Sequence, residues 1–500
     1  MIKGLRPRLV LPVLLAVGLW AALPLAPDIA GTFLVHGASQ ASKRNPQSEG
    51  PPVSAGTPLA WTNPDFTAPE LLGRPTNGSV AISVIPAVEM EIFYDYGVAP
   101  GTYEGRTAIS TAKSGIPLVT TIGGLQPDTR YFYRLRYRKK GGGTFLALGE
   151  HAFHTGRPPG ASFVFAVQAD PHRDENSDLD LYCLTLQNIL REQPDFLIDL
   201  GDTFMTEKFA RNEPEVVARY LEERRYFGLI AHSIPLYLVN GNHEGENGWQ
   251  LNGTSDNLAV WATRARKLYY LNPVPGAFYG GNAKEEPFVG RRDSYYAWEW
   301  GGLLFVVLDP FWYTAKKSGQ NGDNWDWTLG RDQYLWLRQT LGASRAKFKF
   351  VFLHNLPGGL DKNARGGSEA AMLYEWGGRN ADGTPGFAGK RPGWEKPIHQ
   401  LLVEDGVQAV FHGHDHFFAR QELDGVVYQL VPQPSHAGAG TKTQAAEYGY
   451  RDGVFLTSSG YLRLTVAPNQ VKVDYIRTRL PREESGERRN GQVEYSYVIQ

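Results

Sequence analysis

The chain has 500 residues, of which 42% are hydrophobic and 21% are charged, and its formal net charge is −1. This length is too great for one ordinary hydrophobic core and predicts two or three domains. The near-neutral charge gives no electrostatic reason to expect nucleic acid as a partner. Cys183 is the only cysteine, which excludes an intramolecular disulfide and a zinc site ligated by cysteines.

The N-terminus has the composition of a targeting segment. Basic residues between positions 3 and 8 precede an uncharged apolar run at residues 9–27. This pattern is typical of an export signal, and we predict a signal peptide at residues 1–41, cleaved after Ala41. The apolar run also approaches the length that spans a bilayer, so an uncleaved membrane anchor at residues 9–27 is the alternative. Either way we expect a secreted or periplasmic protein, with a polar, proline-rich linker at residues 42–58.

Residues 59–157 alternate short β-like runs with turn residues. Strands are expected at residues 79–85, 89–96, 117–122 and 131–138. Together they predict a small all-β sandwich. The turn and tyrosines at residues 125–133 resemble the corresponding region of fibronectin type III domains, so the sandwich is expected to be of that kind. His151 and His154 are expected to be structural residues of its last strand.

The pattern changes to alternating strands and helices over residues 160–480, which predicts a layered α/β domain. Strands are expected at residues 162–168, 196–200, 234–239, 294–300, 303–308, 348–353 and 407–411, and helices at 181–191, 214–230, 331–341 and 395–404. An antiparallel hairpin at residues 461–475 closes the domain, and residues 481–500 are expected to form a tail. Two long loops, at residues 245–290 and 355–393, are expected to cover a functional site.

Five of these strands end in side chains that can bind metal ions. In chain order these side chains are Asp170, His172, Asp202, Asn242, His354, His414 and His416. Ligand sites in α/β sheets lie at the carboxyl ends of strands, so we expect the seven to converge. They are too many for one four-coordinate ion and suit two ions that share a bridging carboxylate. Mixed nitrogen and oxygen ligands suit iron, zinc or manganese.

The motifs Asp-X-His, Gly-Asp, Gly-Asn-His-Glu, a lone His and Gly-His-X-His occur in this order between residues 170 and 416. This series resembles the calcineurin-like metallophosphoesterases. The resemblance implies a four-layer α/β (α+β) sandwich with mixed β-sheets. It also implies a first metal ion held by Asp170, His172 and His416, a second held by Asn242, His354 and His414, and Asp202 as the bridge.

The same resemblance gives His243 a role that is not metal ligation. His243 would contact the phosphoryl group with Asn242 and protonate the leaving oxygen, while a hydroxide that bridges the metal ions attacks. Its partner would be Glu244 or Asp170, and the sequence leaves both open. His436, on a later Pro- and Gly-rich loop, is a further candidate for contact with substrate.

The all-β region before the catalytic fold is similar to the arrangement in purple acid phosphatases. The chain departs from that group at two positions, because His172 replaces a glycine and Met205 replaces the tyrosine that ligates iron. An iron–tyrosinate site is therefore not expected, and an acid pH optimum cannot be inferred from the similarity.

The predicted function is an exported, dinuclear, metal-dependent phosphoesterase acting on small or macromolecular phosphate mono- or diesters. Two alternatives stay open: a surface binding protein with a vestigial catalytic fold, and a hydrolase of a non-phosphate ester. The complete set of ligand residues argues against the first alternative. The sequence does not indicate which alcohol the substrate carries.

Overall fold

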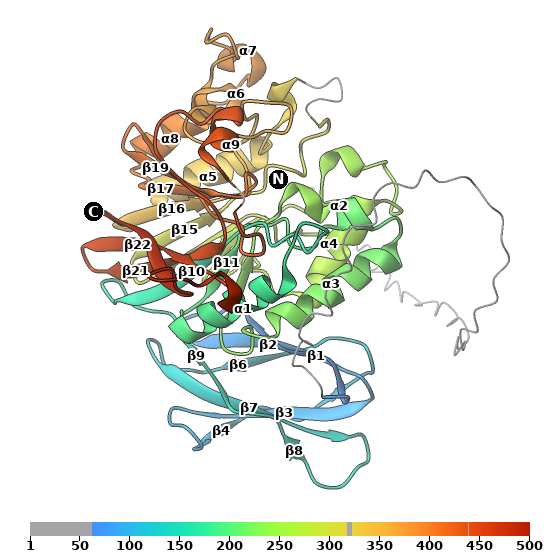
Figure 1. Ribbon diagram of the computed structural model, residues 1–500. Helices are drawn as coiled ribbons and strands as arrows, with labels where there is room; N and C mark the ends of the chain where they lie inside the picture. Colours follow the sequence, from blue (N-terminus) through green and yellow to red (C-terminus); the bar gives the residue numbers. More distant parts are fainter. Residues whose placement is uncertain (1–62, 318–322, 439) are drawn as a thin grey trace, which may run out of the picture. The chain divides into compact units, whose positions relative to one another are not determined.

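The computed structural model describes residues 63–317, 323–438 and 440–500 (Figure 1). The predicted signal peptide or anchor at residues 1–41 and the linker at residues 42–58 lie outside the described residues. Within the described residues, no helix combines the length and the apolar composition that crossing a bilayer requires.

An all-β region of two antiparallel sheets comes first. One sheet has the order β1 (Phe66–Gly73), β2 (Ser79–Pro86) and β6 (Leu118–Gly123). The other is built on β3 (Met90–Gly97) and β7 (Arg130–Lys139), with the short strands β4 (Gly105–Arg106), β5 (Ser110–Ala112), β8 (Leu146–Ala147) and β9 (His151–His154) along them. Alternate residues of β7, such as Tyr133 and Leu135, are buried in one core with Ile82 and Tyr94. The predicted small all-β domain is confirmed; its fibronectin type III character stays a prediction.

The remainder contains two larger sheets. The six-stranded sheet has the order β12 (Leu236–Leu238), β11 (Leu197–Asp199), β10 (Phe163–Gln168), β21 (Gly460–Ala467), β22 (Gln470–Arg477) and β23 (Gln492–Ile499). The eight-stranded sheet has the order β13 (Gly280–Gly281), β14 (Tyr296–Trp300), β15 (Leu303–Val307), β16 (Phe348–Phe352), β17 (Ala409–His412), β19 (Val426–Leu430), β18 (Phe418–Leu423) and β20 (Val454–Leu456). Strands β10–β12 are mutually parallel, as are β15, β16, β17 and β19. Both sheets are therefore mixed, as predicted.

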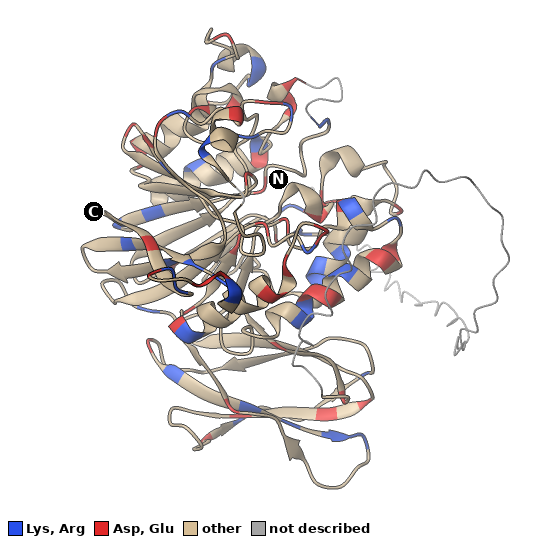
Figure 2. Cartoon of the chain, viewed as in Figure 1, with Lys and Arg blue, Asp and Glu red and all other residues tan. Residues whose placement is uncertain are grey.

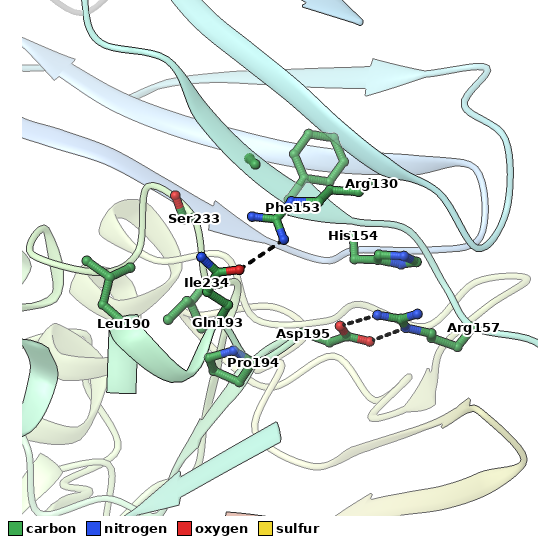
Figure 3. Close-up of a pocket in the computed structure, with 11 residues that line it drawn as sticks. Arg130, Phe153, His154, Arg157, Leu190, Gln193, Pro194, Asp195, Ser233 and Ile234 are labelled. Carbon is green, nitrogen blue, oxygen red and sulfur yellow. Dashed lines mark hydrogen bonds and ion pairs between the residues drawn. The ribbon is translucent and has the colours of Figure 1, made fainter. Parts of the chain in front are cut away.

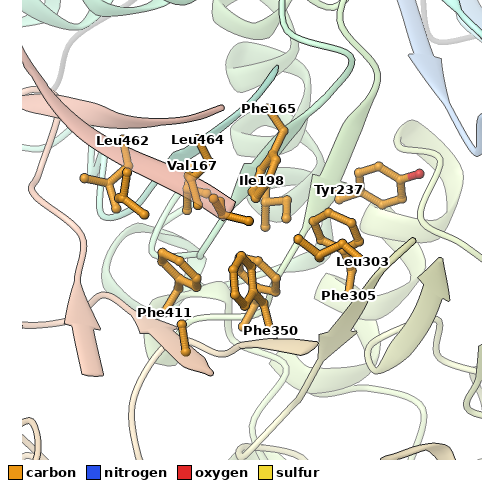
Figure 4. Close-up of a cluster of buried hydrophobic side chains, with 14 of the residues drawn as sticks. Phe165, Val167, Ile198, Tyr237, Leu303, Phe305, Phe350, Phe411, Leu462 and Leu464 are labelled. Atoms are coloured by element: carbon orange, nitrogen blue, oxygen red, sulfur yellow. The ribbon is translucent and has the colours of Figure 1, made fainter. Parts of the chain in front are cut away.

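The main core lies between these two sheets (Figure 4). Phe165 of β10 points toward Phe305 of the facing sheet, with ring centroids 5.1 Å apart, and Phe352 stacks on Phe411 at 5.1 Å. Because side chains of a strand alternate between faces, Ala166 turns to the opposite side. There it joins a second core, formed with helices α1 (Leu179–Glu192), α3 (Glu213–Phe227) and α4 (Leu258–Tyr269).

A third core completes the layers. It joins the other face of the eight-stranded sheet to helices α5 (Arg331–Ala343) and α8 (Ile398–Glu404). Helices, sheet, sheet and helices thus form the predicted four layers. The shorter helices are α2 (Thr206–Phe209), α6 (Tyr374–Gly377), α7 (Phe387–Lys390) and α9 (Lys442–Glu447). Figure 2 shows acidic and basic residues interspersed along α3, a mixture of signs that accords with the near-neutral net charge.

The structure differs from the sequence analysis in three segments, one of which is the expected loop at residues 355–393, which contains the short helices α6 and α7. The expected loop at residues 245–290 contains the helix α4, whose first turn is capped by the Asn257 side chain accepting from the Val260 backbone N–H. Residues 481–500 are not a tail, because they contain β23, which pairs antiparallel with β22 from Val471↔Ile499 to Arg477↔Gln492.

Buried polar groups join the all-β region to the α/β layers. Arg224 of α3 is buried and donates to the Ser83 carbonyl of β2 at 2.6 Å and to the Ser83 hydroxyl at 3.0 Å. The Tyr133 hydroxyl donates to the His232 carbonyl at 2.7 Å. Each group would be left buried and unpaired if its partner were removed, which is costly. These hydrogen bonds therefore favour one particular way for the all-β region to contact the α/β layers.

A pocket of about 180 Å³ lies along the same contact (Figure 3). Arg130 reaches across it from β7 to Gln193 at 3.1 Å, and Arg157 forms an ion pair with Asp195 at 2.7 Å. Arg130, Arg157 and Asp195, which line the pocket, are thus each paired with another residue of its lining.

His151 makes the stability of this contact sensitive to acid. Its ring stacks on that of His232, with centroids 4.0 Å apart, and burial together with His232 lowers its pKa from 6.5 to about 3. The unfolded chain binds this proton near pH 6.5 and the folded chain only near pH 3, so stability falls as the pH falls between these values. At about pH 5 the loss from this one group is about 2 kcal/mol. Urea unfolding at neutral pH and at about pH 5 should show a smaller acid loss in His151→Phe than in wild type. Equal losses in the two proteins would contradict the prediction.

Candidate metal centre

The topology brings the predicted ligands to one edge of the facing sheets. Asp170 and Asp202 follow β10 and β11 of one sheet, while His354 and His414 follow β16 and β17 of the other. Carboxyl ends of parallel neighbouring strands lie at the same edge. Asn242 begins a short 3₁₀ helix, Asn242–Glu244, just after β12.

Several of these residues have a strained backbone. Asp170, His172, Asp202, His414 and His416 have φ between +56° and +79°, the left-handed region that side chains with a Cβ avoid. Such conformations persist where surrounding structure enforces them, and they cluster at functional sites. Gly413 allows the chain to pass close to Asp170, because a Cβ there would lie 2.6 Å from Asp170 Oδ2 and 2.8 Å from Ala169 Cβ.

The ligand atoms form two groups, each within 4.8 Å: Asp170, His172 and His416, and Asp202, His354 and His414. In the first group, Asp170 Oδ1 lies 3.8 Å from His172 Nε2 and 3.7 Å from His416 Nε2. In the second, Asp202 Oδ2 lies 3.2 Å from His354 Nε2. Asp202 Oδ2 is also 3.6 Å from His172 Nε2, so this carboxylate stands beside both groups, as a bridging ligand must.

The other ring nitrogens of three histidines are engaged outside the two groups. His172 Nδ1 lies 3.3 Å from Asp174 Oδ2, His354 Nδ1 lies 2.9 Å from the Leu200 carbonyl, and His414 Nε2 lies 2.6 Å from the Asn363 carbonyl. Such contacts fix the ring orientation and tautomer of metal-binding histidines. The nitrogen that remains in each ring faces the centre.

Buried polar atoms without partners indicate what the centre accommodates. Asp170 Oδ1, His172 Nε2, Asn242 Oδ1 and His354 Nε2 are buried and have no hydrogen-bond partner in the described part of the chain. Buried polar atoms are normally satisfied, so this concentration fits metal ions. Burial also lowers the pKa of His414 to about 3 and that of His416 to about 4, which keeps these imidazoles neutral, the form that binds metal. The residues present therefore fit two cations.

The partner of His243 differs from both residues that the sequence analysis considered. His243 Nδ1 lies 3.2 Å from Glu207 Oε2, on α2. Burial would raise the pKa of Glu207, but His243 and Lys317 outweigh burial and lower it, so Glu207 is an anion beside the imidazole. Glu207 follows the Gly-Asp motif by five residues. It carries no motif of its own, so only the fold reveals it.

Glu244 and Asp170 have other functions. Glu244 Oε1 and Oε2 accept from the backbone N–H groups of Thr203 at 2.6 Å and Asp202 at 2.9 Å, which holds the loop that carries Asp202. Asp170 Oδ2 accepts from the His414 backbone N–H at 2.9 Å. The expectation that one of them pairs with His243 is therefore wrong.

The remaining candidates lie close by. His436 lines a pocket that His172 and His416 also line. Met205, at the position of the iron-binding tyrosine of purple acid phosphatases, is buried and precedes α2, so it offers no phenolate.

Comparison with known proteins agrees with this arrangement. The model of the calcineurin-like phosphoesterase family matches residues 163–418, and no curated protein sequence matched the chain. A solved structure described as PhoD has a TM-score of 0.63 and 16% identity, with 88% of this chain and 91% of that chain covered. The purple acid phosphatase PPD1 from yellow lupin (Lupinus luteus) seeds has a TM-score of 0.56 and 14% identity, with 86% of this chain and 73% of that chain covered.

The fold and the paired ligand groups define a metallophosphoesterase, a hydrolase of phosphoric ester bonds. The chain belongs to the calcineurin-like phosphoesterase family.

Proposed function

We propose that this chain is an exported, dinuclear metallophosphoesterase that hydrolyses phosphate mono- or diesters. The observation that carries the proposal is the convergence of two three-residue ligand groups beside buried atoms that lack partners. The proposed ligands are Asp170, His172 and His416 for one ion, Asn242, His354 and His414 for the other, and Asp202 for both. Nitrogen and oxygen ligands of this kind suit iron, zinc or manganese.

The chain's own residues supply proton transfer and positioning. Two bound cations would neutralise charge on the phosphoryl oxygens and activate a water molecule as the nucleophile. His243, free on the side opposite Glu207, protonates the oxygen of the leaving alcohol. Glu207 orients the His243 ring and stabilises its protonated form. Asn242 binds the phosphoryl group through an uncharged amide, so it adds no negative charge against an anionic substrate.

Export is proposed on the sequence. The apolar run at residues 9–27 follows basic residues, which supports a signal peptide or an uncleaved anchor. An exported enzyme would act on phosphate esters outside the cytoplasm. Determining the N-terminal residue of the mature protein from the native host tests cleavage, because cleavage after Ala41 would leave residue 42 at the N-terminus.

Elemental analysis of the purified enzyme tests the metal centre. After reconstitution with iron, zinc or manganese, we expect two metal ions per chain and turnover of an aryl phosphate. Chelation should abolish turnover and lower the melting temperature, because metal binding stabilises the folded state. One ion or none with every metal would overturn the dinuclear proposal. Turnover of a carboxylic ester, with none of any phosphate ester, would favour the non-phosphate alternative.

A further inference from the structure

A polar pocket of about 350 Å³ opens beside the metal centre. His172 and His416 form one side of it. Other side chains that line it are Asp174, Asn176, Gln433, His436 and Gln444. Its volume is at the small end of the range for ligand pockets, about 300–1,000 Å³. It therefore suits a group of a few heavy atoms next to the phosphate.

The composition of the lining selects among chemical classes. Among the described lining residues there is no lysine or arginine to bind a second anion, and apart from the histidine rings there is no aliphatic or aromatic side chain to bind an apolar group. Asp174 adds a carboxylate, which already accepts from Lys208 at 3.0 Å and from the Asn176 backbone N–H at 2.9 Å. A second negative charge on the substrate would lie beside this carboxylate. The three amides can each donate and accept hydrogen bonds, as hydroxyl groups require.

His436 offers a further unsatisfied polar atom in this pocket. Its Nδ1 is buried and has no hydrogen-bond partner in the parts of the chain that are described. The preceding residue anchors the loop, because Ser435 Oγ donates to the Pro171 carbonyl at 2.7 Å and the Ser435 carbonyl accepts from Asp178 N–H at 2.7 Å. The loop of His436 is thus fastened to the loop that carries His172.

We propose that this pocket binds the organic group of the phosphate ester, and that this group is uncharged and bears hydroxyls. His436 is then a specificity-determining residue that hydrogen-bonds a substrate hydroxyl. The inference rests on the proposed function. It is consistent with the proposed proton donor, because the ring centroid of His243 lies 5.8 Å from that of His172, which lines the pocket.

Three substrates separate the possibilities in the metal-loaded full chain. Glycerol 3-phosphate and 3-phosphoglycerate are nearly isosteric, but the first carries a hydroxymethyl group where the second carries a carboxylate. The third substrate, p-nitrophenyl phosphate, carries an apolar group. We expect kcat/KM for glycerol 3-phosphate to exceed that for 3-phosphoglycerate by at least about tenfold, since the carboxylate loses water without gaining a cation. Equal values for the two would overturn the inference while leaving the proposed function intact. Hydrolysis of none of the three, and of no diester such as bis-p-nitrophenyl phosphate, would count against the proposed function itself.

Replacing His436 with phenylalanine tests the residue while keeping a flat ring. The variant should lose about tenfold in kcat/KM for glycerol 3-phosphate, the value of one hydrogen bond, and less than about twofold for p-nitrophenyl phosphate. The same change in His154→Phe, on β9 of the all-β region, should affect neither. Equal loss on both substrates in His436→Phe would assign His436 to the phosphoryl group and overturn the inference, as would no loss.

Binding gives a measure that does not depend on turnover. Calorimetric titration of glycerol 3-phosphate into metal-loaded His243→Ala should give a Kd that rises about tenfold when His436→Phe is added. An unchanged Kd would overturn the role of His436 whatever the activity of the wild type.

Discussion

Replacing His243 with alanine is expected to lower kcat for an aryl phosphate by about 10²–10⁴-fold, the usual contribution of a positioned general acid. His243 lies beside the ligands but is not proposed to bind metal, and its Nδ1 faces Glu207 at 3.2 Å rather than either ligand group. The variant should therefore retain two metal ions per chain. Turnover and elemental analysis on the same preparation measure both quantities.

The leaving group provides the control for this prediction. An acidic alcohol such as p-nitrophenol leaves without much help from a proton, whereas an alkyl alcohol needs it. His243→Ala should therefore lose more on an alkyl phosphate than on p-nitrophenyl phosphate. A uniform loss on both esters, accompanied by loss of metal, would instead make His243 part of the metal site.

Glu207→Gln tests whether Glu207 acts through His243. Glutamine keeps the size of the side chain but removes the charge that stabilises the imidazolium, so we expect a loss of about 10–100-fold in kcat, as for other residues that orient a catalytic group. The loss should be larger for an alkyl phosphate than for p-nitrophenyl phosphate, because only the alkyl alcohol depends on the proton that His243 supplies. An equal loss on both esters would indicate a merely structural role, for example through the Trp249 Nε1 contact at 3.4 Å.

The metal centre could be predicted from the sequence because its ligands follow strands in a fixed order. Each ligand motif comes directly after an apolar run, and parallel strands bring such positions to one edge. Nothing of this kind marks Glu207. It lies on the four-residue helix α2, and its approach to His243 depends on the left-handed turn at Met205, which carries no sequence signature.

The strand prediction failed for a different reason in the C-terminal segment. Gln492–Ile499 alternates apolar and polar residues, with Val493, Tyr495 and Tyr497 on one face. Charged residues at 482–489 precede it and suggest a solvated tail when the segment is considered alone. β23 forms because β22 offers it an unpaired edge, and tertiary context of this kind decides the conformation of edge strands.

The contact between the all-β region and the α/β layers was also beyond the sequence. Arg224 lies in a helix whose other arginines, and whose glutamates apart from Glu223, are at least partly exposed, so the pattern of α3 does not distinguish it. In the structure it is buried against β2 and donates to Ser83. The strand expected at residues 131–138 does lie within β7, whose alternate residues face a continuous core on one side of that sheet.

Replacing Asp202 with asparagine is expected to remove at least one metal ion and to lower kcat/KM by about 10³-fold or more, since electrostatic stabilisation by a metal ion contributes several kcal/mol. Asp202 Oδ2 lies beside both groups, 3.2 Å from His354 Nε2 and 3.6 Å from His172 Nε2, whereas Asp170 Oδ1 is 3.8 Å from His354 Nε2. Asparagine keeps the shape of the side chain. Its amide oxygen can take the place of Asp202 Oδ1, which accepts from the His243 backbone N–H. Only the charge and one ligand oxygen are lost.

Asp199→Asn is the matched control for Asp202→Asn. Asp199 is equally buried at the end of β11, but it accepts from Gln168 Nε2 at 2.6 Å and from the Thr203 hydroxyl instead of facing the ligand groups. Burial raises the pKa of Asp199 to about 7, so near neutral pH this carboxyl is partly protonated and an uncharged amide there removes only part of a charge. We expect Asp199→Asn to keep two metal ions and most of its turnover. If both variants lose metal equally, the loss comes from disturbing the end of β11, and the bridging role of Asp202 is wrong. Metal loss in Asp202→Asn alone is the result that a bridging carboxylate requires.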